Sequence, residues 1–262
     1  MLYLNGQPVP VTMFPDKTSQ VWKLPEDIFY DTPYDQLFTR CVQIEWKFEH
    51  EGEFMHLAQL KELCFEYGLL AKLKLSYLPY GRQDKGTNNK TTFALYPFAD
   101  LLNFLDFKSV EILDPHSELA IDYIAKSFAT YPKQELANAL NETCSTVVCY
   151  PDKGAVSKYV KIYQDLIGEK YIYGEKVRDQ LTGNITSYQL IGECAGKNVL
   201  IVDDICDFGR TFIFLAKDLY AAGAKEVNMF VTHGLFSGGI KVLTDAGIKR
   251  IFTKNGEVDY GI

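Results

Sequence analysis

The sequence predicts an α/β protein of two similar halves, each a mainly parallel sheet flanked by helices. Short apolar runs alternate along the chain with amphipathic helical stretches, which is the pattern of a parallel sheet covered by helices. This alternation occurs twice, and a polar cluster follows most of the expected strands. We therefore place the division near residues 120–140 and expect domains at 1–128 and 129–262.

The first half contains a clear helix signal. Leu57, Leu60 and Leu63 recur at helical spacing within 56–67, and Gly68 follows as a C-cap. The other elements expected here are strands at 73–80 and 109–113 and a helix at 96–105.

The second half repeats the alternation. We expect strands at 146–150, 198–202, 227–232 and 251–253, with helices beginning at Ala155 and near Thr211. In open α/β sheets, ligands collect at the carboxyl ends of the strands. The polar clusters of this chain follow strands at 80–85, 114–116, 150–154, 203–211 and 232–237. Their shared position indicates that the candidate functional residues of each sheet lie at its carboxyl edge.

Composition excludes several classes of protein. Of the 262 residues, 47% are hydrophobic and 23% are charged, which is ordinary for a chain that buries a core. The net charge of −7 argues against nucleic acid or an anionic membrane as partner. Apolar stretches are strand-sized, and the first twenty residues lack an apolar signal core. Six cysteines without a C-x-x-C pair indicate reduced thiols, and we expect a cytoplasmic protein.

The most informative segment is 199–211, where an apolar strand leads to Asp203 and Asp204 and then to a short loop before a helix. Loop amides and a helix N-terminus bind phosphate, and two adjacent carboxylates accept hydrogen bonds from vicinal ribose hydroxyls. The alternative is a strand end whose aspartates cap the next helix. Asp207 is a third acid in the same segment, and capping a helix does not require three carboxylates. The cluster therefore favours a site for a ribose phosphate.

This segment resembles the phosphoribosyl-pyrophosphate-binding motif of the type I phosphoribosyltransferase fold, which implies two flavodoxin-like halves with the active site in the cleft between them. The motif is shared by phosphoribosyltransferases and by ribose-phosphate diphosphokinases, the phosphoribosyl-pyrophosphate synthetases. By this resemblance Asp203 and Asp204 hold the ribose hydroxyls. The same resemblance assigns the 5-phosphate to the loop formed by Asp207, Phe208, Gly209, Arg210 and Thr211.

Two further segments resemble the ATP-binding parts of the synthetases. Arg82, Gln83 and Asp84 match a Tyr-x-Arg-Gln-Asp stretch that contacts ATP in that family. Phe14 and Asp16 resemble its Phe-x-Asp-Gly-Glu loop, which holds adenine across a subunit interface, although Lys17 and Thr18 replace the Gly-Glu. The alternatives are a solvated turn at 80–85 and core packing for Phe14.

The resemblance also implies a metal and a catalytic loop. His116 and Asp152 match a histidine and an aspartate that bind magnesium in the synthetases, although imidazole is not a preferred ligand of a hard cation. Lys176 and Arg178 resemble the start of a flexible catalytic loop, whose cations stabilise charge during diphosphoryl transfer. The segment 171–186 is polar and aperiodic, and we expect a mobile flap there. The segment 232–238 matches a Thr-His-Gly-x-x-Ser-Gly motif whose individual roles stay unassigned.

The phosphate loop departs from the family pattern. The synthetases have Asp-Thr-Ala-Gly-Thr, whereas this chain has Phe208 and Arg210 among the corresponding residues. An aromatic face and a guanidinium suit a 5-phosphate that continues into a second phosphate and a base. ADP-ribose has this form and a free anomeric hydroxyl, so it is a candidate acceptor beside ribose 5-phosphate.

We therefore predict a magnesium-dependent enzyme that transfers the β,γ-diphosphate of ATP to the anomeric hydroxyl of a 5-phosphorylated ribose. We also expect a homo-oligomer, a dimer or larger. One alternative is a phosphoribosyltransferase that consumes the activated sugar. Such an enzyme has no need of the ATP-binding residues at 82–84. The other is a non-catalytic subunit associated with a synthetase, which has no need of His116, Asp152, Lys176 or Arg178.

Overall fold

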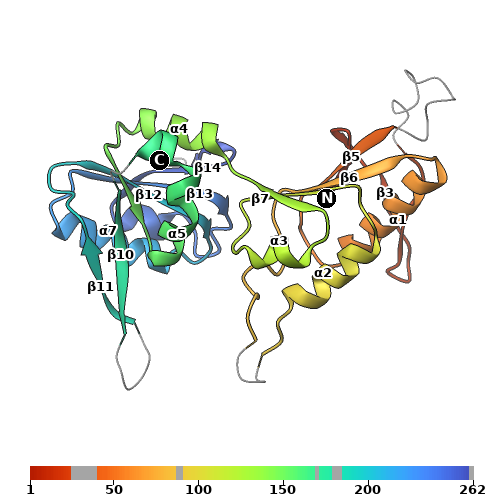
Figure 1. Ribbon diagram of the computed structural model, residues 1–262, viewed down its shortest axis with the longest axis horizontal. Coiled ribbons are helices and arrows are strands. Elements are labelled where there is room, and N and C mark those ends of the chain that lie inside the picture. The colour runs from red at the N-terminus through yellow and green to blue at the C-terminus, as the bar shows by residue number, and fades with distance from the viewer. Residues whose placement is uncertain (25–39, 87–90, 169–170, 179–184, 260–262) are drawn as a thin grey trace. The chain divides into compact units, whose positions relative to one another are not determined.

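The computed structural model of the chain forms two compact units, Met1–Thr130 and Tyr131–Ile262 (Figure 1). It describes all residues except 25–39, 87–90, 169–170, 179–184 and 260–262. Each unit has its own sheet and its own hydrophobic core.

The first unit is built on a six-stranded sheet in the order β2-β1-β5-β6-β7-β8. Strands β5 to β8 are parallel, and β1 and β2 extend the sheet with antiparallel pairings. The strands are β1 (Leu2–Leu4), β2 (Gln7–Pro8), β5 (Cys41–Trp46), β6 (Leu70–Leu75), β7 (Val110–Leu113) and β8 (Ser127–Thr130). A separate antiparallel pair is formed by β3 (Val11–Met13) and β4 (Ser19–Val21).

Three helices connect the parallel strands of this unit, namely α1 (Glu53–Glu66), α2 (Leu95–Phe104) and α3 (Leu119–Tyr123). Because each connection runs to the next strand in the same direction, right-handed crossovers place all three helices on one face of the sheet. Burial follows this layout, since Val42, Ile44 and Trp46 of β5 are buried and the intervening residues are half-buried.

The second unit has a seven-stranded sheet in the order β11-β10-β9-β12-β13-β14-β15. The five inner strands are parallel, and the two edge strands pair antiparallel. The strands are β9 (Val147–Tyr150), β10 (Tyr171–Arg178), β11 (Ile185–Ile191), β12 (Asn198–Cys206), β13 (Glu226–Gly234), β14 (Ile248–Thr253) and β15 (Gly256–Glu257). The helices are α4 (Lys133–Glu142), α5 (Lys153–Ile162), α6 (Gln164–Ile167), α7 (Arg210–Ala221) and α8 (Lys241–Asp245).

Helices cover both faces of the central strands in this unit. One buried cluster includes Leu215 of α7 with Val231 of β13, and the other includes Tyr159 of α5 with Phe230 of β13. Consecutive residues of β13 therefore point into opposite cores, which explains why the strand is buried without a break from Val227 to His233. The predicted fold class, two mainly parallel sheets flanked by helices, is confirmed.

Several elements differ in extent from the expectation. β12 continues four residues beyond 202, so Asp203 and Asp204 belong to the strand and the phosphate loop shrinks to 207–209. β6 ends at Leu75, five residues before the predicted end at residue 80. The expected flap at 171–186 is instead largely two paired strands, β10 and β11. Aromatic and β-branched residues such as Tyr171, Ile172 and Tyr173 favour strand there, a preference that outweighs the polar composition.

The structure also bears on the cysteines and on membrane-spanning helices. No disulfide joins the six cysteines, all of which lie in the described ranges. Within those ranges, no helix is long and apolar enough to span a membrane.

Candidate active site

The candidate site of the second unit begins at the carboxyl end of β12. Asp203 and Asp204 are neighbours on a strand, so their side chains leave it toward opposite faces of the sheet. The Asp204 amide donates to Asp203 Oδ1 at 3.0 Å. Burial raises the pKa of Asp203 well above the usual carboxyl range, and the charges of Asp204 and Asp152 raise it further. Three carboxylates of two neighbouring strand ends are thus electrostatically coupled.

The loop after β12 leads directly into the N-terminus of α7. Gly209 occupies the N-cap position with φ of 76°, a left-handed conformation that favours glycine. A Cβ at this position would also lie 2.7 Å from Leu243 Cδ2. The first amides of an α-helix have no partner within the helix and carry the positive end of its dipole. A phosphate is the kind of ligand that such a helix start binds.

Phe208 and Arg210 flank this capping glycine. The Phe208 side chain is 59% exposed, and Arg210 is also exposed, whereas Thr211 is half-buried. An aromatic ring with this exposure is not held by the core, and the residue that departs most from the family pattern is therefore on the surface of the phosphate loop.

A second loop, after β13, is attached to the first through the backbone. The amides of Leu235 and Phe236 both donate to the Cys206 carbonyl, at 2.9 and 3.1 Å. Phe236 has φ of 48°, an uncommon conformation for a non-glycine residue. A Cβ on Gly238 would lie 2.9 Å from the Phe208 carbonyl oxygen. The motif at 232–238, to which no residue roles could be assigned from sequence, supports the backbone of the phosphate loop.

Asp152 follows the neighbouring strand β9 and caps α5. Its Oδ1 accepts from the amides of Gly154 and Ala155 at 3.0 and 3.1 Å. Both capping bonds use one oxygen, so capping does not itself require Oδ2. Next to it, Lys153 Nζ donates to Glu175 Oε1 of β10 at 2.5 Å, which ties this loop to the strand that carries Lys176 and Arg178.

Lys176 and Arg178 lie within β10, and the backbone of Lys176 pairs with Tyr188 of β11. The register between β10 and β11 shifts between Val177 and Arg178. The side chains of both cations lie outside the described part of the chain. The structure thus places the two predicted catalytic residues on a hairpin strand.

The first unit carries the predicted ATP-binding loop after β6. Tyr80 has φ of 61°, and its hydroxyl donates to Glu51 Oε1 at 2.6 Å. This hydrogen bond and burial raise the pKa of Tyr80 to about 12. Arg82 and Gln83 are exposed, whereas Asp84 is only 7% exposed. The side chains of this loop that solvent and ligands can reach are therefore Arg82 and Gln83, while Asp84 is packed beneath them.

Phe14 and Asp16 lie in the turn between β3 and β4. The Phe14 ring packs edge-on against Trp22 with centroids 6.1 Å apart. Asp16 Oδ1 accepts from the amide and the hydroxyl of Thr18 at 3.0 and 2.7 Å. Lys17 has φ of 71°, so this lysine adopts the conformation that glycine favours at the same position of the family motif.

His116 follows β7 and is exposed, whereas the preceding Asp114 and Pro115 are buried. Asp114 has φ of 45°, so the chain turns sharply where the strand ends. Across the described ranges, no group of three or more His, Cys, Asp or Glu side chains could hold a metal. Magnesium needs no such cage, because proteins hold it through one or two carboxylates together with substrate phosphates. The carboxylate of Asp152 fits that donor set, and His116 is the weaker ligand by chemistry.

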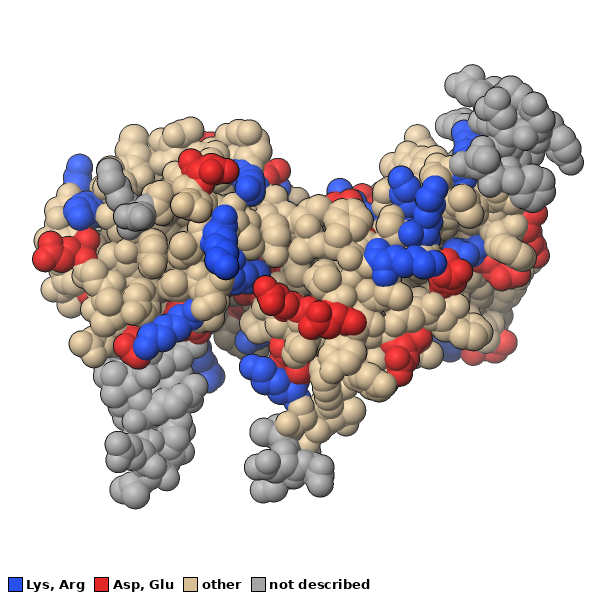
Figure 2. Space-filling view, in the orientation of Figure 1, with Lys and Arg blue, Asp and Glu red and all other residues tan. Residues whose placement is uncertain are grey.

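Charges of both signs are interspersed over the face drawn in Figure 2. With a net charge of −7, the protein as a whole repels anions, so anionic substrates depend on locally placed cations. Arg82, Lys153 and Arg210 are exposed cations that lie within the candidate motifs.

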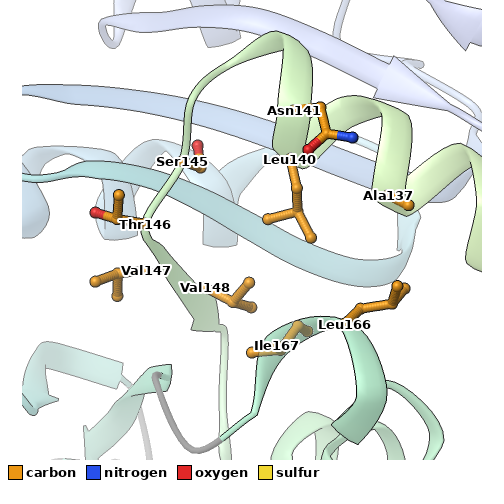
Figure 3. Close-up of a pocket in the computed structure, with 9 residues that line it drawn as sticks. All are labelled: Ala137, Leu140, Asn141, Ser145, Thr146, Val147, Val148, Leu166 and Ile167. Carbon is orange, nitrogen blue, oxygen red and sulfur yellow. The ribbon is translucent and has the colours of Figure 1, made fainter.

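A cavity of about 300 Å³ lies elsewhere in the second unit, between α4, α6 and β9 (Figure 3). Leu140, Val148 and Ile167 form its apolar part, and Thr146 lies at the amino end of β9. Asp152 follows the opposite end of that strand, so the cavity does not belong to the candidate site.

Known proteins resemble this arrangement. The phosphoribosyl transferase domain family matches residues 116–261. The chain is 31% identical over 172 residues to ribose-phosphate pyrophosphokinase of Pyrococcus abyssi, covering 64% of this chain and 59% of that protein. It is 30% identical over 185 residues to the enzyme of the same name from Sulfolobus acidocaldarius, covering 69% of this chain and 63% of that one.

A solved structure shares the fold. Phosphoribosylpyrophosphate synthetase from Mycobacterium smegmatis superposes with a TM-score of 0.74 at 20% identity, covering 93% of this chain and 78% of that one. The chain spans about 62% of the length of the first curated relative it matches, the ribose-phosphate pyrophosphokinase of Saccharolobus solfataricus.

These matches and the site geometry define a protein of the type I phosphoribosyltransferase fold. The chain belongs to the phosphoribosyl transferase domain family. The curated relatives that it resembles are named ribose-phosphate pyrophosphokinases, the family that its motifs resemble.

Under the function expected from the sequence, Gly238→Ala should weaken binding of the acceptor sugar phosphate. The new Cβ would lie 2.9 Å from the Phe208 carbonyl oxygen, so the phosphate loop must shift. Because small displacements of positioning groups are costly, we expect the KM for ribose 5-phosphate to rise about tenfold. Gly86→Ala is the matched control, since among the described residues its Cβ would meet only the Thr91 carbonyl oxygen, at an ordinary contact distance of 3.7 Å. A Gly238→Ala enzyme with the wild-type KM contradicts this support role.

Under the function expected from the sequence, the raised pKa of Asp203 predicts a pH dependence of acceptor binding. Protonation removes the charge that strengthens hydrogen bonds from ribose hydroxyls, and here it begins at higher pH than for an ordinary aspartate near ~3.9. Affinity for ribose 5-phosphate should therefore fall as pH is lowered from ~8 to ~5, as measured by calorimetric titration. Asp203→Asn retains only the pH dependence of the sugar phosphate itself. Identical pH profiles for the two proteins would refute the prediction.

Proposed function

We propose that this protein transfers the β,γ-diphosphate of ATP to the anomeric hydroxyl of a 5-phosphorylated ribose, giving AMP and a ribosyl pyrophosphate. The observation that carries the proposal is the end of β12, where Asp203 and Asp204 precede a helix start capped by left-handed Gly209. Carboxylates there accept hydrogen bonds from the ribose hydroxyls, and the amides at 207–211 receive the 5-phosphate. The names of the curated relatives support the same reaction.

The first unit would supply the ATP-binding residues. Arg82 offers a planar fork of donors to phosphate oxygens, and Gln83 can pair with the edge of the base. Their exposure in the loop after β6 supports this role, and buried Asp84 would act through the conformation of the loop. Phe14 and Asp16 are proposed to contribute to adenine binding from the β3–β4 turn.

Asp152 would hold magnesium, which would supply neutralisation of phosphate charge, and His116 is a candidate ligand by the resemblance alone. The anomeric oxygen forms a bond to the β-phosphorus in line, the bond from that phosphorus to the α–β bridging oxygen breaks, and AMP leaves. Lys176 and Arg178 stabilise the charge on the transferred group. The hydroxyl proton passes to solvent, and we assign no general base.

The first acceptor is ribose 5-phosphate. ADP-ribose is a second candidate because Phe208 is 59% exposed on the phosphate loop with Arg210 exposed close by in sequence. An exposed aromatic ring stacks on a base, and a guanidinium binds a second phosphate. The synthetase pattern has small or hydroxyl residues there, which provide neither contact.

Two alternatives make different predictions. A phosphoribosyltransferase would consume phosphoribosyl pyrophosphate, and exposed Arg82 and Gln83 would have no substrate to bind. A non-catalytic subunit would need the Asp152 carboxylate only as the cap of α5 and would form no AMP. We further propose a cytoplasmic homo-oligomer, with no nucleic acid or membrane as partner.

The direct test offers ribose 5-phosphate and ADP-ribose in parallel to the purified protein with ATP and magnesium. Chromatography with mass spectrometry should detect AMP and a diphosphorylated sugar from at least one acceptor. If ADP-ribose is used, Phe208→Thr should lower its kcat/KM about tenfold, the loss expected for one stacking contact, and leave ribose 5-phosphate nearly unaffected. AMP formation with neither acceptor contradicts the proposed reaction.

Lys176→Ala should lower turnover far more than ATP affinity. A cation that acts on charge developing during transfer contributes to kcat, so a loss of about 10²–10³-fold is expected. Steady-state kinetics and displacement of a fluorescent nucleotide measure the two quantities. Lys197→Ala, at an exposed lysine just before β12, is the control. Unchanged turnover in Lys176→Ala would remove this residue from the mechanism.

A further inference from the structure

Lys158 is a lysine on the sheet-facing side of α5. It lies three residues after buried Ala155 and precedes buried Tyr159, so the helical repeat directs it toward the sheet. Its side chain is 17% exposed, and its Nζ is buried. Lysine is seldom buried unless its charge is compensated. Its position therefore requires a reason beyond packing.

An acidic strand end faces this lysine. Lys158 Nζ lies 3.8 Å from Asp204 Oδ2, and the Asp204 side chain is 6% exposed. Strand alternation agrees with this contact, because Asp204 shares a sheet face with Leu200 and Val202, which belong to the core cluster beneath α5. The ammonium of Lys158 thus contacts Asp204, the second carboxylate of the proposed ribose site, on the face of the sheet that α5 covers.

The position of Lys158 is defined by its surroundings. Its Nζ lies 4.7 Å from the centroid of the Tyr159 ring, an arrangement that favours a cation. Tyr159 stacks on Tyr150 of β9 and on Tyr163, with centroids 6.0 and 5.3 Å apart. Tyr150 directly precedes the loop that carries Asp152. The three stacked tyrosines connect α5 to the end of β9, and the Tyr159 ring contacts the Lys158 ammonium on the buried side of the helix.

Asp152, Asp203 and Asp204 gather at two adjacent strand ends, and like charges at short range repel. The Lys158 ammonium, 3.8 Å from Asp204 Oδ2, offsets that repulsion. A buried ion pair alone is a poor source of stability compared with apolar packing of similar volume. The lysine is better explained by what it does to the Asp204 carboxylate.

We propose that Lys158 is a positioning residue for the acceptor, whose buried ammonium orients the Asp204 carboxylate to receive ribose hydroxyls. This role rests on the proposed function of the site. Lys158 does not touch the reacting atoms, so its loss should weaken acceptor binding and leave the chemical step largely intact.

The test compares Lys158→Met, which has similar length and no charge, with Lys158→Arg, which keeps the charge. Lys161→Met is the matched control, at an exposed lysine in the last turn of the same helix. Lys158→Gln provides a polar replacement if the Met variant does not fold, as judged by its melting temperature. For each protein, KM for the acceptor, KM for ATP and kcat are measured, together with calorimetric binding of ribose 5-phosphate.

Without Lys158, the hydrogen bond from a ribose hydroxyl to the Asp204 carboxylate loses its orientation. We therefore expect the acceptor KM to rise about tenfold or more in Lys158→Met or Lys158→Gln. The KM for ATP and kcat should change less than about threefold, and Lys158→Arg should recover most of the affinity. An unchanged acceptor KM, an equal loss for both substrates, or failure of the Arg variant to recover affinity overturns the positioning role.

The calorimetric arm separates this inference from the proposed reaction. A wild type that binds ribose 5-phosphate without forming AMP refutes the diphosphotransfer and still tests Lys158 through binding. A wild type that neither turns over nor binds the sugar phosphate overturns both.

Discussion

The candidate site depends on the register of β12 between β9 and β13. All three strands are parallel, and β12 is hydrogen-bonded to both neighbours, with pairs from Asn198↔Glu226 to Cys206↔Gly234 on one side. Carboxyl ends of adjacent parallel strands lie at the same edge, so the loops that follow them are neighbours. The two amides that share the Cys206 carbonyl then attach the β13 loop to the phosphate loop. A shift of one residue in this register would turn Asp203 and Asp204 to exchanged faces.

The second consequence is electrostatic. The carboxylates of Asp203 and Asp204, at the strand end beside Asp152, are unfavourable for folding. Burial and mutual repulsion both favour the neutral form and raise the pKa of Asp203. Proteins tolerate such clusters where a ligand uses them, and ribose hydroxyls are donors that suit them. The opposite need, attraction of phosphate by an acidic protein, is met locally by helix N-termini and positioned cations. Lys158 offsets the carboxylate repulsion on one face of the sheet, because its ammonium lies 3.8 Å from Asp204 beneath α5.

Much of this could be predicted from sequence, for identifiable reasons. Strand ends followed by acids, glycines and basic residues are local signals, and they located Asp203, Asp152 and Arg82 at the carboxyl edges. The extents of strands were less predictable, because pairing with β13 continues β12 through Asp203 and Asp204. The β10–β11 hairpin was missed because its pairing is tertiary and its composition is polar.

Other features leave no sequence signal that can be interpreted in isolation. Left-handed backbone at Lys17, Tyr80 and Phe236 occurs at residue types that rarely adopt it. Lys158 resembles any lysine of an amphipathic helix until Asp204 is found 3.8 Å from its ammonium. One signal was available, since Lys158 falls beside Tyr159 on the apolar side of α5, where a charge is unexpected.

We propose that the edge formed by β9, β12 and β13 binds a 5-phosphorylated ribose. The most direct measurement is a crystal structure of the protein with ribose 5-phosphate. The account predicts ribose hydroxyls within about 3 Å of the Asp203 and Asp204 carboxylates, and the phosphate on the amides at the start of α7. A sugar phosphate bound elsewhere, with these carboxylates facing only solvent, would contradict it.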